Sequence, residues 1–148
     1  MHVISRRRFL TAFVKALAPL GAAVDAQEYK AGKVYRVGLL GSVTASTAPH
    51  LLQAFRQGLR DLGWVEGRNI VIEYRWAEGR LDRLTDLAAD LVRLKVDVIV
   101  SAGTPGPIAA KHVTRTIPIV MVAAGDPVAT GLVASLARPG GNVTGLSI

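Results

Sequence analysis

The sequence predicts an α/β domain built on a doubly wound, parallel sheet of five strands. From residue 34 onward, short runs rich in valine, isoleucine and leucine alternate with stretches in which leucines recur at helical spacing. This alternation is typical of repeated βαβ units, which make the strands parallel and place helices on both faces of the sheet. With 148 residues, 50% of them hydrophobic, the chain can build one such domain but not two.

Five strands are expected, at residues 34–40, 70–76, 97–101, 117–122 and 142–148. The second strand alternates apolar and polar side chains, which indicates a half-exposed strand or an edge strand. The third holds a continuous apolar run, as a parallel strand covered on both faces does. Pro118 removes one ladder donor from the fourth strand but is tolerated near its start.

Four helices are expected between these strands, at residues 49–62, 81–94, 107–113 and 127–137. Gly63 follows the first helix as a C-cap residue. The apolar side chains that share one face of that helix are Leu51, Phe55, Leu59 and Leu62. Asp126 and Pro127 match the N-cap and first position of the fourth helix. The side chains expected to face inward from the fourth helix are Val128, Leu132, Val133 and Leu136.

Residues 1–26 are interpreted as an export signal, and residues 27–148 as the α/β lobe. Three arginines, Arg6 to Arg8, precede an apolar stretch that is too short and interrupted to span a membrane. Small residues up to Ala26 predict cleavage before Gln27. The arginines resemble a twin-arginine signal, although the general secretory route stays open. An amphipathic helix packed on the domain is the alternative. The chain has no cysteine, so we expect a periplasmic protein that is not a lipoprotein.

The formal net charge of +7 does not by itself indicate a nucleic-acid partner. Residues 1–26 hold four basic residues and one acid, and the remaining 14 basic and 10 acidic residues give +4. Within residues 80–93, arginines and aspartates alternate, as on a helix face laced with ion pairs. No nucleic-acid partner is therefore expected.

The binding site of such a sheet is expected beyond the carboxyl ends of its strands. Residues 41–47 combine hydroxyls and backbone amides that suit an anion, although an ordinary helix cap explains one of the hydroxyls. Residues 101–107 bring glycines and hydroxyls to a strand end, where a tight turn is the alternative. Gly125 can expose an amide to a carboxylate, whereas Asp126 fits a cap better. The predicted ligand-binding residues are Ser42, Thr44, Ser101, Gly103, Thr104, Gly125 and Asp126.

The sequence contains no pattern that indicates a catalytic site, a metal site or a cofactor site. His50 and His112 lack a serine and an acid in a recognisable arrangement, and no spacing of histidines and acids suggests a metal site. The loop after the first strand matches neither the dinucleotide-binding nor the phosphate-loop pattern. Trp76 ends the second strand, where packing on a neighbouring helix is favoured over stacking on a ligand. No cofactor is expected.

Three segments carry a family resemblance. They are residues 65–79, residues 117–127 with Ile117-Pro118-Ile119-Val120 and Gly125-Asp126-Pro127, and residues 136–145 with Arg138-Pro139-Gly140-Gly141-Asn142. These segments resemble the substrate-binding proteins of ABC transporters, in particular those assigned to tryptophan and tyrosine transport. The resemblance implies a type I periplasmic binding protein, in which two lobes close on a ligand and deliver it to a membrane permease. It further implies that this chain is the N-terminal lobe only, with the second lobe missing.

The sequence thus predicts the solute-binding component of an ABC importer, not an enzyme, with a small carboxylate-bearing ligand such as an amino acid. Two alternatives stay open. One is a small exported enzyme of flavodoxin-like fold, and the other is a periplasmic ligand-sensing domain that partners a receptor.

Overall fold

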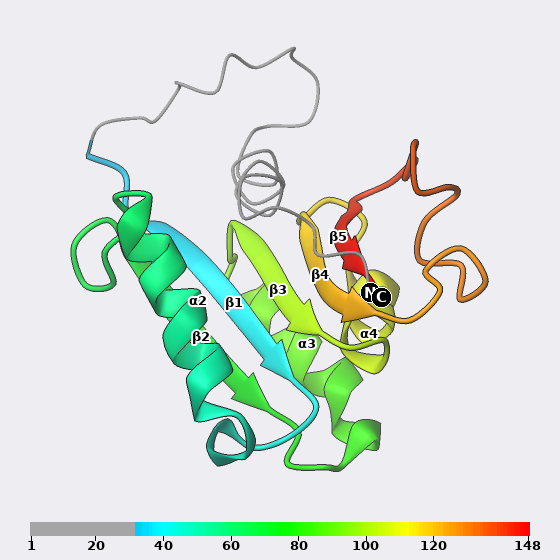
Figure 1. Cartoon of the computed structure of the whole chain (residues 1–148), viewed down its shortest axis with the longest axis horizontal. Helices are drawn as coiled ribbons and strands as arrows, with labels where there is room; N and C mark the ends of the chain where they lie inside the picture. Colours follow the sequence, from blue (N-terminus) through cyan, green and yellow to red (C-terminus); the bar gives the residue numbers. More distant parts are fainter. Residues whose placement is uncertain (1–31) are drawn as a thin grey trace.

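A five-stranded, all-parallel sheet forms the centre of the domain (Figure 1). The computed structural model describes residues 32–148, so the predicted export signal lies outside the described residues. The strands are β1 (Tyr35–Gly41), β2 (Ile70–Trp76), β3 (Val98–Ala102), β4 (Ile119–Ala124) and β5 (Val143–Ser147). Their order across the sheet is β2-β1-β3-β4-β5, which confirms the predicted parallel sheet and places β2 at an edge.

Helices cover both faces of the sheet, as the doubly wound prediction requires (Figure 1). The helices are α2 (Pro49–Asp61), α3 (Leu84–Arg93) and α4 (Pro105–Val113), with short 3-10 turns η1 (Ala45–Thr47) and η2 (Leu81–Arg83). α2 packs on one face through Phe55 and Leu59. α3 and α4 lie side by side on the other face.

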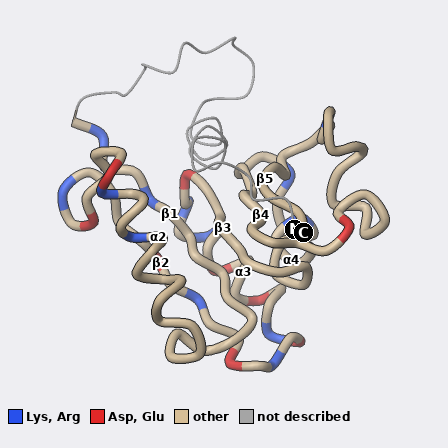
Figure 2. The backbone as a smooth tube through the Cα atoms, in the orientation of Figure 1, with Lys and Arg blue, Asp and Glu red and all other residues tan. Residues whose placement is uncertain are grey.

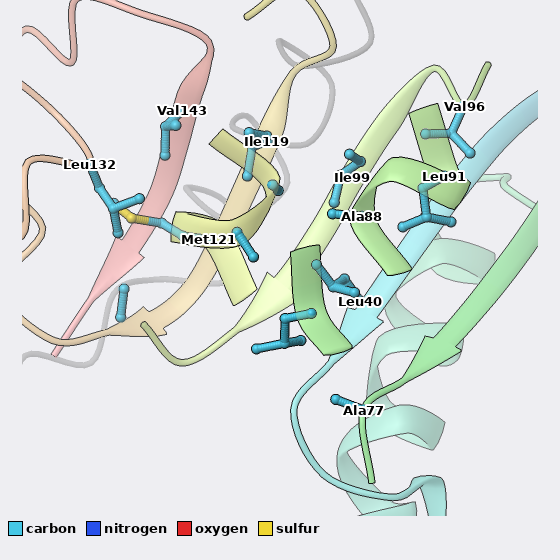
Figure 3. Close-up of a cluster of buried hydrophobic side chains, with 14 of the residues drawn as sticks. Leu40, Ala77, Ala88, Leu91, Val96, Ile99, Ile119, Met121, Leu132 and Val143 are labelled. Carbon is cyan, nitrogen blue, oxygen red and sulfur yellow. The ribbon is translucent and has the colours of Figure 1, made fainter. Parts of the chain in front are cut away.

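The core consists of two apolar layers, one on each face. Figure 3 shows the larger layer, in which α3, α4 and the segment after β4 meet the sheet. Leu40, Leu91 and Ile99 are fully buried there. The smaller layer lies under α2 and includes Val37, whose side chain is also fully buried. Because alternate residues of each strand face opposite layers, every central strand contributes to both.

The predicted fourth helix, residues 127–137, is wrong. This segment consists of turns, although the Asp126 cap that should start a helix does form. Gly131 adopts a φ of 70°, a left-handed conformation that ends the first turn. Lys111 of α4 then donates to the carbonyl oxygens of Gly131 and Leu132, the latter at 3.1 Å, so partners outside the segment bond these carbonyls.

The inward face predicted for residues 127–137 is only half correct. Leu132 and Val133 are buried, at 2% and 5% exposure, whereas Val128 and Leu136 are 44% and 67% exposed. Without a helix, the spacing of these four residues no longer aligns them on one face. The segment is anchored by these two central residues and by Pro127 at its start, which is also buried.

Two helix details also differ from the prediction. α4 begins at Pro105, two residues earlier than expected, because a proline fits the first helical positions. In α2 only Leu59 is buried, and Leu51 is 63% exposed. Leu51 lies in the first turn of α2, which follows the carboxyl edge of the sheet. Gly63 has the positive φ, 84°, expected after the C-cap residue Leu62.

The edge strand β5 approaches β4 unusually closely. At Gly145, φ is 138°, and a Cβ built there would lie 1.9 Å from the carbonyl oxygen of Met121. The register between the two strands shifts between Met121 and Ala124. Only glycine fits this position.

No helix within residues 32–148 has the length and apolar character needed to cross a membrane.

Candidate functional site

The candidate site lies at the carboxyl edge of the sheet, where β1 and β3 are neighbours. The chain leaves β1 into α2 on one face and leaves β3 into α4 on the other. Such a reversal is the topological switch point at which open α/β sheets bind ligands. The loops after β1, β2, β3 and β4 all begin at this edge because every strand is parallel.

Ser42, directly after β1, carries a buried hydroxyl without a partner. Among the residues that the structure describes, its Oγ is the one buried side-chain oxygen or nitrogen that makes no hydrogen bond. Its backbone is fixed: the amide of Gly79 donates to the Ser42 carbonyl at 2.8 Å, and the amide of Ala77 donates to that of Gly41 at 2.8 Å. An unsatisfied buried hydroxyl costs free energy, so the Ser42 hydroxyl would be stabilised by a hydrogen-bond partner.

The other hydroxyls of this loop bond to one another. The Thr44 hydroxyl lies 2.9 Å from that of Ser46 and 2.8 Å from that of Thr47. No side chain caps η1 or α2. The helix-cap alternative therefore does not account for this loop, and the three hydroxyls form a cluster beside Ser42.

Ser101 is used within the fold. Its hydroxyl donates to the carbonyl oxygen of Leu40 at 2.7 Å, and the residue is 1% exposed. A Cβ on Gly106 would lie 2.0 Å from this Oγ, so α4 starts in direct contact with the serine. Ser101 therefore joins β1, β3 and α4 beneath the predicted site.

Gly103 and Thr104 join the third loop to the fourth. Gly103 has a φ of 76°, and its amide donates to the carbonyl of Val122 at 2.9 Å. The Thr104 hydroxyl accepts the amide of Gly125 at 3.0 Å. The structure thus brings these three predicted residues together, although the Gly125 amide is already bonded.

Asp126 caps the turn that follows β4. Its Oδ1 accepts the amides of Val128 and Ala129, both at 3.0 Å. The side chain is otherwise exposed at the carboxyl edge. The preferred interpretation of Asp126 as a cap is confirmed.

Ala123 is a feature that the sequence did not indicate. It adopts a left-handed φ of 53° next to the irregularity that ends β4, and it is exposed. Non-glycine residues in this conformation are strained and cluster at binding sites. Alanine carries no signal for a positive φ, so no sequence pattern could have revealed it.

Trp76 packs against the end of β1 through the Cε3 and Cζ3 side of its indole. A Cβ on Gly41 would lie 2.2 Å from two carbons of the indole, and the ring stacks on Tyr74 with centroids 6.4 Å apart. The Nε and Nη2 groups of Arg56 donate to the Tyr74 hydroxyl at 2.9 and 2.7 Å. Burial raises the pKa of Tyr74, a shift that the hydrogen bond from Arg56 opposes. Trp76 is therefore positioned by β1 and β2 at the carboxyl edge.

Charges are dispersed over the described backbone, with basic and acidic residues interspersed (Figure 2). On α3 itself Arg93 pairs with Asp90, as the predicted helix face with ion pairs requires. The pairs Arg80–Asp82 at 2.9 Å and Arg83–Glu78 at 3.6 Å lie before that helix. Within residues 32–148, no group of three or more histidines and acids is placed to hold a metal ion.

Comparison with known proteins agrees with this geometry. The family model described as ABC transporter substrate binding protein matches residues 36–147. A tyrosine-binding protein of Clostridioides difficile is 36% identical over 115 residues, which are 78% of this chain and 33% of that protein. The chain therefore spans about a third of the length of that relative.

Two solved structures share the fold over 39% of their own length. A ligand-free, open substrate-binding protein with adhesive properties from Clostridium difficile is 33% identical over 77% of this chain, with a TM-score of 0.72. An ABC domain in complex with L-Trp from Streptococcus pneumonia is 28% identical over 78% of this chain, also with a TM-score of 0.72. With its sheet order, its switch-point loops and a family match over nearly the whole described segment, the chain belongs to the ABC transporter substrate-binding protein family.

Proposed function

We propose that this chain is the ligand-binding lobe of an ABC importer's solute-binding protein and that its ligand is a small carboxylate-bearing molecule, an amino acid. Two similar proteins support this ligand class, one described as tyrosine-binding and one solved with L-Trp. The family is one of binding proteins, in keeping with the expectation that the chain is not an enzyme. This argues against the flavodoxin-like enzyme.

The unpartnered hydroxyl of Ser42 is the observation that carries the proposal. In the proposal Ser42 donates to the ligand carboxylate, with the Thr44 hydroxyl cluster beside it. Gly103 and Thr104 supply backbone and hydroxyl groups from the neighbouring loop, and Gly125 brings the fourth loop against them. Asp126 offers negative charge to the ligand ammonium. Ser101 supports the site from below, because its hydroxyl is bonded to Leu40.

The proposed protein has a second lobe that closes over the ligand and presents it to a permease. The length of the relatives supports this, since this chain covers 39% of each of the two solved chains described above. Closure needs contacts from both sides, because a ligand shifts a conformational equilibrium only through its different affinity for the two states. Co-purification of the native protein with a permease tests the partner, whereas co-purification with a receptor would favour a sensing domain.

The proposed site of action is the periplasm, reached through the export signal at residues 1–26. The arginines and the apolar stretch of that segment support export. Terminal sequencing of the protein recovered from the periplasm should give Gln27 as the first residue. Recovery of the intact Met1 terminus from the cytoplasm would contradict this location.

Calorimetric titration of the full-length native protein with L-tyrosine and L-tryptophan tests the proposed function. Both ligands should bind, and Ser42→Ala should weaken binding about tenfold or more, because a hydrogen bond to a charged group contributes roughly 1.5–3 kcal/mol. Ser135→Ala is the matched control, since that hydroxyl bonds within its own turn, to Arg138. The proposal would be rejected if neither amino acid binds, or if Ser42→Ala binds them with wild-type affinity.

A further inference from the structure

We infer that Trp76 is a specificity-determining residue of this site, the wall on which the aromatic side chain of the ligand stacks. The inference rests on the proposed function and adds to it the orientation of the ligand and the residue that selects it. It starts from the position of the indole at the end of β2, opposite Gly41 in the parallel register.

The indole of Trp76 is fixed in position by its neighbours, and part of it stays accessible. One side is fixed by Gly41, where any Cβ would overlap the ring, and by stacking on Tyr74 with an interplanar angle of 12°. The residue is only partly buried. Within the part of the chain that the structure describes, its Nε1–H donates no hydrogen bond and is not a buried unsatisfied group. A fixed ring with an accessible portion and a free donor is suited to receive a planar partner.

Three large apolar side chains are exposed near the ends of β1 and β2, next to the Thr44 hydroxyl cluster. They are Val43 at 46% in the loop after β1, Leu51 at 63% in the first turn of α2 and Leu81 at 53% at the start of η2. The loops after β3 and β4 instead hold Thr104, Gly125 and Asp126, with their hydrogen bonds. Ser42 directly follows β1, the strand that lies between β2 and β3.

We expect these apolar and polar groups to orient a bound amino acid. Its carboxylate and ammonium groups lie over Ser42 and the ends of β3 and β4, and its side chain lies over the end of β2 against Trp76. Aromatic pairs gain attraction beyond area burial alone. Trp76 therefore favours tyrosine and tryptophan over aliphatic amino acids of similar size.

Selectivity is the test, measured by calorimetry on the full-length native protein with L-tyrosine and L-leucine. Trp76→Ala should reduce the ratio of the two affinities at least fivefold, mainly through weaker binding of tyrosine. Trp76→Phe should restore most of that ratio because it keeps an aromatic face. Gly41→Ala displaces the ring without altering it and should reduce the ratio as well. Trp64→Phe, on the residue that packs edge-on against Tyr35 at 5.4 Å, should leave the ratio unchanged.

A second readout reports the contact itself. In protein labelled with 5-fluorotryptophan, the ¹⁹F resonance that disappears in Trp76→Phe belongs to Trp76, and the one that disappears in Trp64→Phe belongs to Trp64. L-Tyrosine should shift the first resonance and leave the second in place. If tyrosine binds but the Trp76 resonance and the affinity ratio of Trp76→Ala stay unchanged, the inference is overturned while the proposed function stands. If no amino acid binds, both are overturned.

Discussion

The hydroxyl of Ser101 connects three elements through one atom. It donates to Leu40 across the β1–β3 pair and occupies the space next to Gly106. Its position at the end of a strand suggested ligand binding in the sequence, but the bonded geometry shows a role in the fold. Small polar residues at strand ends look alike in a sequence, because only the tertiary contacts reveal whether the hydroxyl is already used.

A double-mutant cycle tests this contact. Gly106→Ala should lower the free energy of unfolding by about 1–3 kcal/mol, because its Cβ would lie 2.0 Å from the Ser101 Oγ. Ser101→Ala alone should cost about 1 kcal/mol for the lost hydrogen bond. In the double variant the nearest side-chain atom is Ser101 Cβ at 3.2 Å, so the total cost should be well below the sum. Urea unfolding measures all four proteins, and additive costs would refute the contact.

Tyr74 gives the stability a pH dependence at alkaline pH. Because burial raises its pKa above the ordinary value of about 10, its contribution is complete below that pH and is lost as the pH rises through the folded-state value. Tyr74→Phe should be less stable than wild type at pH 8 by about 1 kcal/mol, through loss of the acceptor for Arg56. The gap should narrow by pH 11. Urea unfolding at both pH values checks this, and a constant gap would disprove it.

At the scale of an element, helix α3 ends on a strained residue. Lys95 follows the C-cap residue Leu94 with a φ of 53°, a conformation that glycine adopts at little cost. Lys95→Gly should raise the free energy of unfolding by up to about 1 kcal/mol. Arg93→Gly, two residues earlier and inside the helix, should lower it by about 1 kcal/mol. Thermal unfolding of both variants measures these changes, and the same sign in both would contradict the capping argument.

The elements differ in how well the sequence predicts them, for physical reasons. β2 has the predicted bounds, Ile70–Trp76, because its alternating pattern stands between clear turn residues. Residues 127–137 carried a helical pattern and a correct cap, yet Gly131 and the long-range bonds from Lys111 overrode it. In the candidate site, the sequence located the loops through the parallel topology. It could not distinguish the free hydroxyl of Ser42 from the engaged one of Ser101, nor foresee the strain at Ala123.

For the molecule as a whole, the fifth strand depends on a single glycine. Gly145→Ala should lower the free energy of unfolding by roughly 3 kcal/mol or more, because the added Cβ meets the Met121 backbone and φ is unsuited to alanine. Gly58→Ala, on the open side of α2 with nothing within 4 Å, should instead stabilise the protein by about 0.5–1 kcal/mol. Chemical denaturation of the two variants provides the measurement. Equal effects of the two alanines would show that β5 does not need a glycine.

The order of the strands also governs how the protein emerges during synthesis. β1 lies between β2 and β3, and the bond that joins Ser101 to Leu40 spans 61 residues. A nascent chain in which β2 has paired with β1 but β3 has not left the ribosome holds the interior strand β1 with one edge unpaired. Such an edge invites association with other chains, and contacts of long sequence separation form slowly. An edge of β1 therefore stays unpaired from the translation of residue 41 until β3, which ends at Ala102, is available.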